Sequence, residues 1–158
     1  MYRKIFVFFS FLLVLFLFFS CAKKPIFLPR LDGDFICQVR GAIEGEPFAA
    51  TVYADGRVVY ASPDALVGVV ASADGETLTL GGRELPADAL GGLFLPARLL
   101  CDAYEVTGSG TEGKGGACFV DGANAHGSRR VYVDGAGEPC RVSGSFDGIS
   151  ADFELTWK

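Results

Sequence analysis

The sequence contains a single histidine, His126, and none of its cysteine pairs has CxxC spacing. Structural zinc sites need several closely spaced cysteines or histidines, and thiol-disulfide catalysts use CxxC, so neither kind of site is expected. No GxSxG or HExxH motif surrounds His126, and no pair of carboxylates stands out as an acid and base couple. The sequence therefore predicts no metal, no cofactor, no catalytic residues and no enzymatic activity.

The chain also lacks an excess of positive charge. Its formal net charge is −5, and removal of residues 1–20 would take away only Arg3 and Lys4, which makes the remainder −7. An acidic domain has no electrostatic attraction for a polyanion. No nucleic-acid partner is therefore expected.

Only one long apolar run occurs, at the start of the chain. Arg3 and Lys4 precede residues 5–19, which are all apolar except Ser10. A transmembrane helix needs about 20 apolar residues, so this run is short for a membrane span. A short basic head followed by a short apolar centre is typical of a secretory signal.

The dipeptide Ser20-Cys21 closes this run and resembles the lipobox of bacterial lipoproteins. The resemblance implies that residues 1–20 are removed and that Cys21 becomes the first mature residue and carries a lipid with fatty acyl chains such as palmitate. The protein would then be anchored by this lipid to the extracytoplasmic face of the cell membrane. An uncleaved anchor and secretion without a lipid are the alternatives. Residues 21–34, which include Lys23, Lys24 and Pro25, are interpreted as a tether.

Residues 35–158 are interpreted as one domain, because their length suffices for one hydrophobic core. They read as short strands separated by turns, and Asp55-Gly56 is a strong hairpin signal. Residues 149–157 alternate without error between apolar and polar side chains. One buried face and one wet face indicate an antiparallel sheet, so the expected fold is mainly β. Residues 41–46 are expected to form a turn.

Two stretches depart from the strand pattern. In residues 62–66, Ser62 is expected to cap one helical turn that has Pro63 at its first position. Residues 86–90 and 96–101 both begin with proline and predict short helices. The apolar residues 91–95 between them either cover the open side of the sheet or form an exposed contact surface.

Residues 108–116 are rich in glycine and are predicted to be too flexible for a strand or helix. They contain GxxxxGK but not the following serine or threonine of a phosphate-binding loop. The segment is therefore interpreted as a surface loop. His126 is likewise interpreted as a loop residue without a partner.

Four cysteines follow the one that is expected to carry lipid: Cys37, Cys101, Cys118 and Cys140. An even number in an exported protein favours disulfides. If Cys118 and Cys140 lie on strands that flank a third strand, they are roughly 9–10 Å apart, beyond disulfide reach. Pairing of Cys101 with Cys118 is favoured, and four free thiols are the alternative.

Three stretches, residues 48–60, 62–68 and 130–142, together resemble the lipoprotein-carrier superfamily of LolA, LolB and RseB-like proteins. The resemblance implies a strongly curved antiparallel sheet, a half-open β-barrel, with short helices covering its concave face. It also implies that the concave face binds a lipid acyl chain or another hydrophobic ligand. The residues that would line this face are Phe48, Val52, Leu66, Val69, Leu93, Phe94, Leu95, Leu99, Phe153, Leu155 and Trp157.

The expected function is thus that of a membrane-anchored binding protein. The alternative is a regulatory lipoprotein with a filled core that acts on a protein partner in the cell envelope. Alternating apolar residues produce a pocket or a packed core by the same chemistry, so both interpretations stay open at this point.

Overall fold

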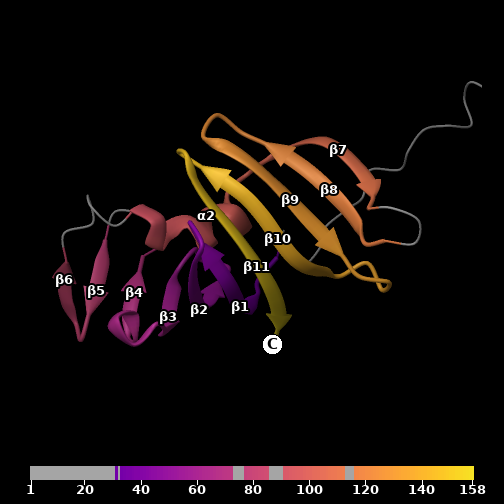
Figure 1. Ribbon diagram of the computed structural model, residues 1–158. Helices are drawn as coiled ribbons and strands as arrows, with labels where there is room; N and C mark the ends of the chain where they lie inside the picture. The colour runs from indigo at the N-terminus through magenta and orange to yellow at the C-terminus, as the bar shows by residue number, and fades with distance from the viewer. Residues whose placement is uncertain (1–30, 32, 73–76, 86–90, 113–115) are drawn as a thin grey trace, which may run out of the picture.

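The computed structural model describes residues 31, 33–72, 77–85, 91–112 and 116–158. They form one open sheet in which all neighbouring strands are antiparallel, in the order β6-β5-β4-β3-β2-β1-β11-β10-β9-β8-β7 (Figure 1). The prediction of a mainly β domain with an antiparallel sheet is confirmed. The strands are β1 (Ile36–Ile43), β2 (Glu46–Tyr53), β3 (Val58–Ser62), β4 (Val69–Ala71), β5 (Leu78–Leu80), β6 (Arg83–Leu85), β7 (Glu105–Thr111), β8 (Cys118–Ala123), β9 (Gly127–Val133), β10 (Pro139–Phe146) and β11 (Ile149–Trp157).

The first and last strands pair with each other in the middle of the sheet. β1 and β11 are in register from Cys37 opposite Trp157 to Ile43 opposite Ala151. Strands β1 to β6 follow one another on one side of this pair, and β11 back to β7 on the other. The successive strands β6 and β7 therefore form the two outer edges of the sheet.

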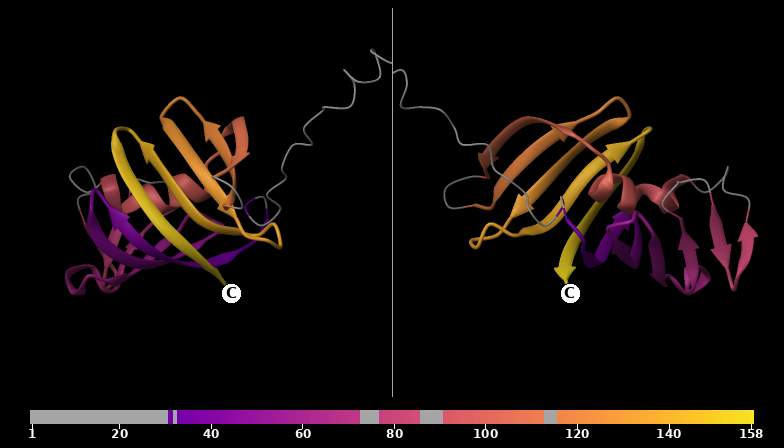
Figure 2. Two further views of the ribbon diagram at one scale, coloured as in Figure 1. Left: turned by 45° about the vertical axis from the view of Figure 1, so that its right-hand side comes forward. Right: turned by 180° about the vertical axis from the view of Figure 1, so that it is seen from behind.

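The α-helix α2 (Leu95–Cys101) lies between β6 and β7 in the sequence and packs against β2, β10 and β11. Figure 2 shows it between the two halves of a strongly twisted sheet. It has proline in its first turn, as predicted for residues 96–101, and it buries Leu95, Leu99 and Leu100. The face of the sheet that packs against α2 is called the inner face below.

The inner face carries the hydrophobic core. In β11, Ala151, Phe153 and Leu155 are buried, while Ser150 and Glu154 on the opposite face are exposed. This confirms the alternation predicted for residues 149–157. Within the part of the chain that the structure describes, every buried core residue lies between Cys37 and Leu155, so a chain that starts at residue 22 contains all of them.

The turn predicted at residues 41–46 is present but shorter, because residues 41–43 and 46 belong to strands. Strand β1 continues to Ile43, which lies opposite Glu46, and the chain turns only at Glu44 and Gly45, whose φ angles are 50° and 85°. Gly41 lies within the strand between Phe48 and Phe153, whose rings make an edge-to-face contact at 5.9 Å. Glycine marks a close approach of neighbouring residues here, not a bend.

The prediction that residues 108–116 are too flexible to form an element is wrong for their first part. β7 extends to Thr111, and Gly110 lies opposite Phe119 of β8. A Cβ atom at Gly110 would lie 2.8 Å from Cζ of Phe119, so the absence of a side chain makes room for this ring. A glycine can therefore occupy a strand where a neighbouring aromatic ring covers it.

The helical turn after β3 is η1 (Asp64–Leu66), a 3-10 helix, and Gly68 follows it with a φ of 82°. The prediction that Ser62 caps it is wrong. Ser62 is the last residue of β3 and pairs with Ala49, so Pro63 takes the N-cap position without a side-chain hydrogen bond.

Several predicted features lie outside the described residues. They are the signal peptide at residues 1–20, the lipid-bearing Cys21, most of the tether at residues 21–34 and the helix at residues 86–90.

Replacement of Gly41 by alanine tests the close packing where β1 meets β11. A Cβ atom there would lie 2.0 Å from the carbonyl oxygen of Asp152 and 2.6 Å from Cβ of Phe153. We expect Gly41→Ala to lower the free energy of unfolding by at least about 2 kcal/mol in urea denaturation of residues 22–158. Gly135→Ala is the control, because nothing lies within 4 Å of its Cβ position. Equal effects of the two substitutions would contradict the central role of this contact.

Candidate functional site

Most residues predicted to line a concave face belong to the packed core of the inner face. Eight are buried there, and three are partly buried and pack against it. The buried residues are Phe48, Val52, Val69, Phe94, Leu95, Leu99, Phe153 and Leu155, and the partly buried ones are Leu66, Leu93 and Trp157. Under α2, side chains therefore fill the space over the sheet, and Leu99 is 0% exposed.

An apolar cleft of about 580 Å³ opens beside this core, where β1 turns into β2. It lies between that turn and two short 3-10 helices, η1 and η2 (Gly91–Phe94). Three of the predicted residues, Phe48, Leu66 and Leu93, line this apolar cleft. Its other lining residues are Ile43, Glu44, Glu46, Pro47, Tyr60, Pro63 and Gly92. The residues predicted to line the concave face thus divide into those that line the apolar cleft and those that pack in the core beside it.

Tyr60 holds one wall of the apolar cleft in place. Its hydroxyl donates a hydrogen bond to the carbonyl oxygen of Leu93 at 2.8 Å, which joins β3 to η2. The Tyr60 ring also lies 6.1 Å from the ring of Phe48. Burial raises the pKa of Tyr60, so the hydroxyl stays protonated and continues to donate this bond.

Tyr60, the two glutamates and the prolines of this cleft were not among the predicted ligand-binding residues. One signal could have revealed Tyr60, because it shares the face of β3 that carries Val58. No comparable signal marks Pro47 or Pro63, because the cleft forms from segments that are distant in the sequence.

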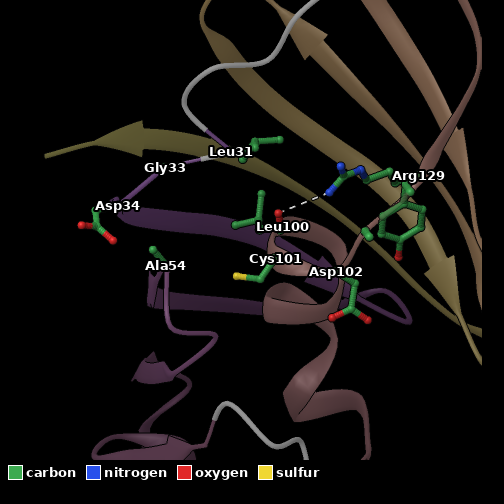
Figure 3. A pocket seen from close by; sticks show the side chains of 10 residues that line it. Leu31, Gly33, Asp34, Ala54, Leu100, Cys101, Asp102 and Arg129 are labelled. Carbon is green, nitrogen blue, oxygen red and sulfur yellow. Dashed lines mark hydrogen bonds between the residues drawn. The ribbon is translucent and has the colours of Figure 1, made fainter.

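A second cleft, of about 740 Å³, lies at the C-terminal end of α2 (Figure 3). The Arg129 guanidinium donates hydrogen bonds to the carbonyl oxygens of Leu99 at 2.7 Å and Leu100 at 3.3 Å. It also lies 4.3 Å from the ring centre of Tyr104. A cation at this place satisfies the last carbonyls of the helix and opposes the negative end of its dipole. We call this the charged cleft, since Asp34, Asp102 and Arg129 line it.

All four cysteines of the described residues are free. Cys118 in β8 and Cys140 in β10 lie on either side of β9, the arrangement under which they were predicted not to pair. Cys101 in α2 lies against the carbonyl oxygen of Tyr53 in β2 at 3.7 Å, whereas Cys118 lies beside Thr111 of the edge strand β7. The structure therefore contains no bond between Cys101 and Cys118.

His126 does have a partner, contrary to the interpretation of its loop. Its Nδ1 lies 3.1 Å from a carboxylate oxygen of Asp147, and its ring stacks on Phe146 at 5.0 Å. Both side chains of this contact are more than half exposed, at 59% and 63%. Within the described residues no nucleophilic side chain bonds to His126, so the pair is a surface contact between two turns.

The described residues contain no group of three or more side chains that could hold a metal ion. Among these residues, no helix combines the length and apolar character that crossing a membrane requires.

No protein-family model, curated protein or solved structure matches the chain. The resemblance of residues 48–60, 62–68 and 130–142 to lipoprotein carriers therefore stays a prediction.

Alkaline pH tests the burial of Cys101 at the charged cleft. Burial and the neighbouring charge of Asp102 raise the pKa of its thiol from 9.0 to about 11. The folded state therefore keeps the proton while the unfolded chain loses it, so this stabilisation is present below pH 9 and lost as pH rises toward 11. We expect the loss to be about 1–2 kcal/mol in urea denaturation.

Cys101→Ala should remove this part of the pH dependence, whereas Cys118→Ala, at an exposed thiol, should leave it unchanged. If the free energy of unfolding falls equally steeply between pH 9 and 11 in wild type and Cys101→Ala, the raised pKa of Cys101 is contradicted.

Proposed function

We propose that this chain is a membrane-anchored, non-enzymatic lipoprotein that binds a lipid acyl chain or another hydrophobic ligand. The single observation that carries the proposal is the apolar cleft beside the core. Its volume of about 580 Å³ lies within the range of about 300–1,000 Å³ that is typical of small-molecule sites. Phe48, Leu66 and Leu93 provide apolar surface for the ligand.

The fold supports this proposal through its curvature. We interpret the sheet as a half-open barrel whose concave side is the inner face, with α2 and η2 as its covering helices. The twist of the sheet on either side of α2 supports this interpretation (Figure 2). The packed core then serves as the floor that keeps the cleft open, because Phe48 belongs to both.

The proposed anchor restricts how far the domain can lie from the membrane. Leu31 lines the charged cleft, so the tether joins the domain there. Leu31 lies ten positions after Cys21, and extended chain spans at most about 3.6 Å per residue. The charged cleft would therefore stay within about 36 Å of the lipid at Cys21.

One observation favours the alternative function, a regulatory lipoprotein that acts on a protein partner in the cell envelope. Beneath α2 the core is closed to solvent, with Leu99 0% and Leu100 1% exposed. Under this alternative the apolar surface around Leu93 would contact the partner, and the cleft would bind no small ligand.

Binding of an uncharged apolar dye, N-phenylnaphthylamine, to residues 22–158 tests the proposal by fluorescence. We expect saturable binding that dodecanol displaces, with an affinity about five- to tenfold weaker in Leu93→Gln, because the substitution places an amide in the cleft wall. Val106→Gln is the control, since Val106 is 62% exposed on the edge strand β7. Absence of saturable binding by wild type would refute ligand binding and favour the partner-binding alternative.

The proposed anchor predicts the behaviour of Cys21→Ser expressed with its signal peptide. Without the thiol no lipid can be attached, so we expect loss of the acyl mass in intact-protein mass spectrometry and loss of the mature protein from the membrane fraction. Cys118→Ser, at an exposed thiol of β8, should keep the acyl mass and should stay in the membrane fraction. A cleaved Cys21→Ser protein that stays membrane-bound would contradict lipid anchoring.

A further inference from the structure

The charged side chains that line the apolar cleft are acidic. Glu44 and Glu46 line it, and Asp64 belongs to η1, which forms one of its walls. No lysine, arginine or histidine is among the described residues that line this cleft. An amphiphile bound there would place its head group near carboxylates that no lining cation neutralises.

Glu44 is held in a fixed position at the turn between β1 and β2. Its carboxylate accepts hydrogen bonds from the backbone N–H of Ser150 and from the Ser150 hydroxyl, the latter at 2.8 Å. The backbone N–H of Glu44 in turn donates to the carbonyl oxygen of Ser150 at 2.9 Å. These bonds lower the pKa of Glu44, so it carries its negative charge even in mildly acidic solution.

Glu46 lies on the adjacent strand, is exposed and forms no ion pair with the described residues. Two arginines of the domain are held elsewhere, on the outer face of the sheet. There Arg130 pairs with Asp121 at 2.7 Å, and Arg141 pairs with Asp152. The charge of Glu46 is thus available to a ligand.

The apolar and acidic groups of the cleft lie next to one another. Glu46 is followed by Pro47 and Phe48 in β2, so the carboxylate lies at the edge of the surface that would contact an alkyl chain. Pro63 and Leu66 continue that surface on the side of η1. A ligand whose chain lies on this surface would bring its head group to the turn that carries Glu44.

We infer that the ligand of the apolar cleft is a single-chain amphiphile with an ammonium head group, whose alkyl chain contacts Phe48, Leu66 and Leu93 and whose head lies beside Glu44 and Glu46. A carboxylate or phosphate head would be repelled by the same pair, and a hydroxyl head would gain only a hydrogen bond. The inference rests on the proposed function, because it specifies the ligand of the same cleft. It adds a selectivity that apolar lining alone does not produce.

Three amphiphiles with twelve carbon atoms each separate the contribution of the head group from that of the chain. Dodecylammonium, dodecanol and laurate compete with N-phenylnaphthylamine for residues 22–158 at neutral pH, with the ionic probes below their micelle concentrations and dodecanol below its solubility limit. We expect dodecylammonium to displace the dye at the lowest concentration and laurate at the highest, with dissociation constants about tenfold apart at low salt. Added salt should bring the dissociation constants of the probes closer together, because it screens the charges of Glu44 and Glu46.

Glu46→Gln should reduce the ratio of the laurate and dodecylammonium dissociation constants several-fold and leave displacement by dodecanol unchanged. Glu46→Arg should reverse the order of the two charged probes. Glu105→Gln on β7 is the matched control and should keep the wild-type order. Since Glu46 is exposed, these variants are expected to fold, and an unchanged thermal unfolding curve checks this.

The outcomes separate the two proposals. If dodecanol fails to displace the dye from wild type, ligand binding in the cleft is refuted, and the inference falls with it. If dodecanol displaces the dye but laurate binds as tightly as dodecylammonium, or Glu46→Gln leaves their difference unchanged, the selectivity is refuted and the proposed function stands.

Discussion

The pairing of β1 with β11 is the interaction on which the rest of the structure depends. It joins the two ends of the domain and converts two separate meanders into one sheet. Without it, each meander would expose an unpaired strand edge rich in apolar side chains. The pairing also brings Phe153 next to Gly41 and, across it, to Phe48, so the aromatic contact at the centre of the core follows from the register.

The same pairing gives α2 its place and thereby separates two clefts. α2 packs against β10 and β11 on one side of the centre and against β2 on the other. The charged cleft, with Arg129, lies at the C-terminal end of α2. The apolar cleft, with its glutamates, lies near η2, which precedes the N-terminal end of α2. The end of the domain that joins the tether is thus chemically distinct from the end proposed to bind a ligand.

Three predictions failed in whole or in part for one physical reason: local residue preferences were overruled by contacts across the sheet. Glycine at positions 41 and 110 suggested a turn and a loop, yet both are strand residues beside aromatic rings of neighbouring strands. Ser62 has the chemistry of a helix cap but pairs with Ala49 instead. A single sequence shows which conformations a residue tolerates and not which neighbour it meets.

The strands, the alternation of β11 and the helix that follows Pro96 could be read from the residues alone, because these features depend on periodicity and local backbone preference. Which apolar residues are core and which face a cleft depends on contacts between distant parts of the chain. Leu99 and Leu93 carry the same side chain, yet one is buried by α2 packing and the other lines the apolar cleft. Glu44 and Glu46 acquire their position at that cleft because β1 turns back beside Ser150 and η2 folds over Tyr60, contacts between residues far apart in the chain.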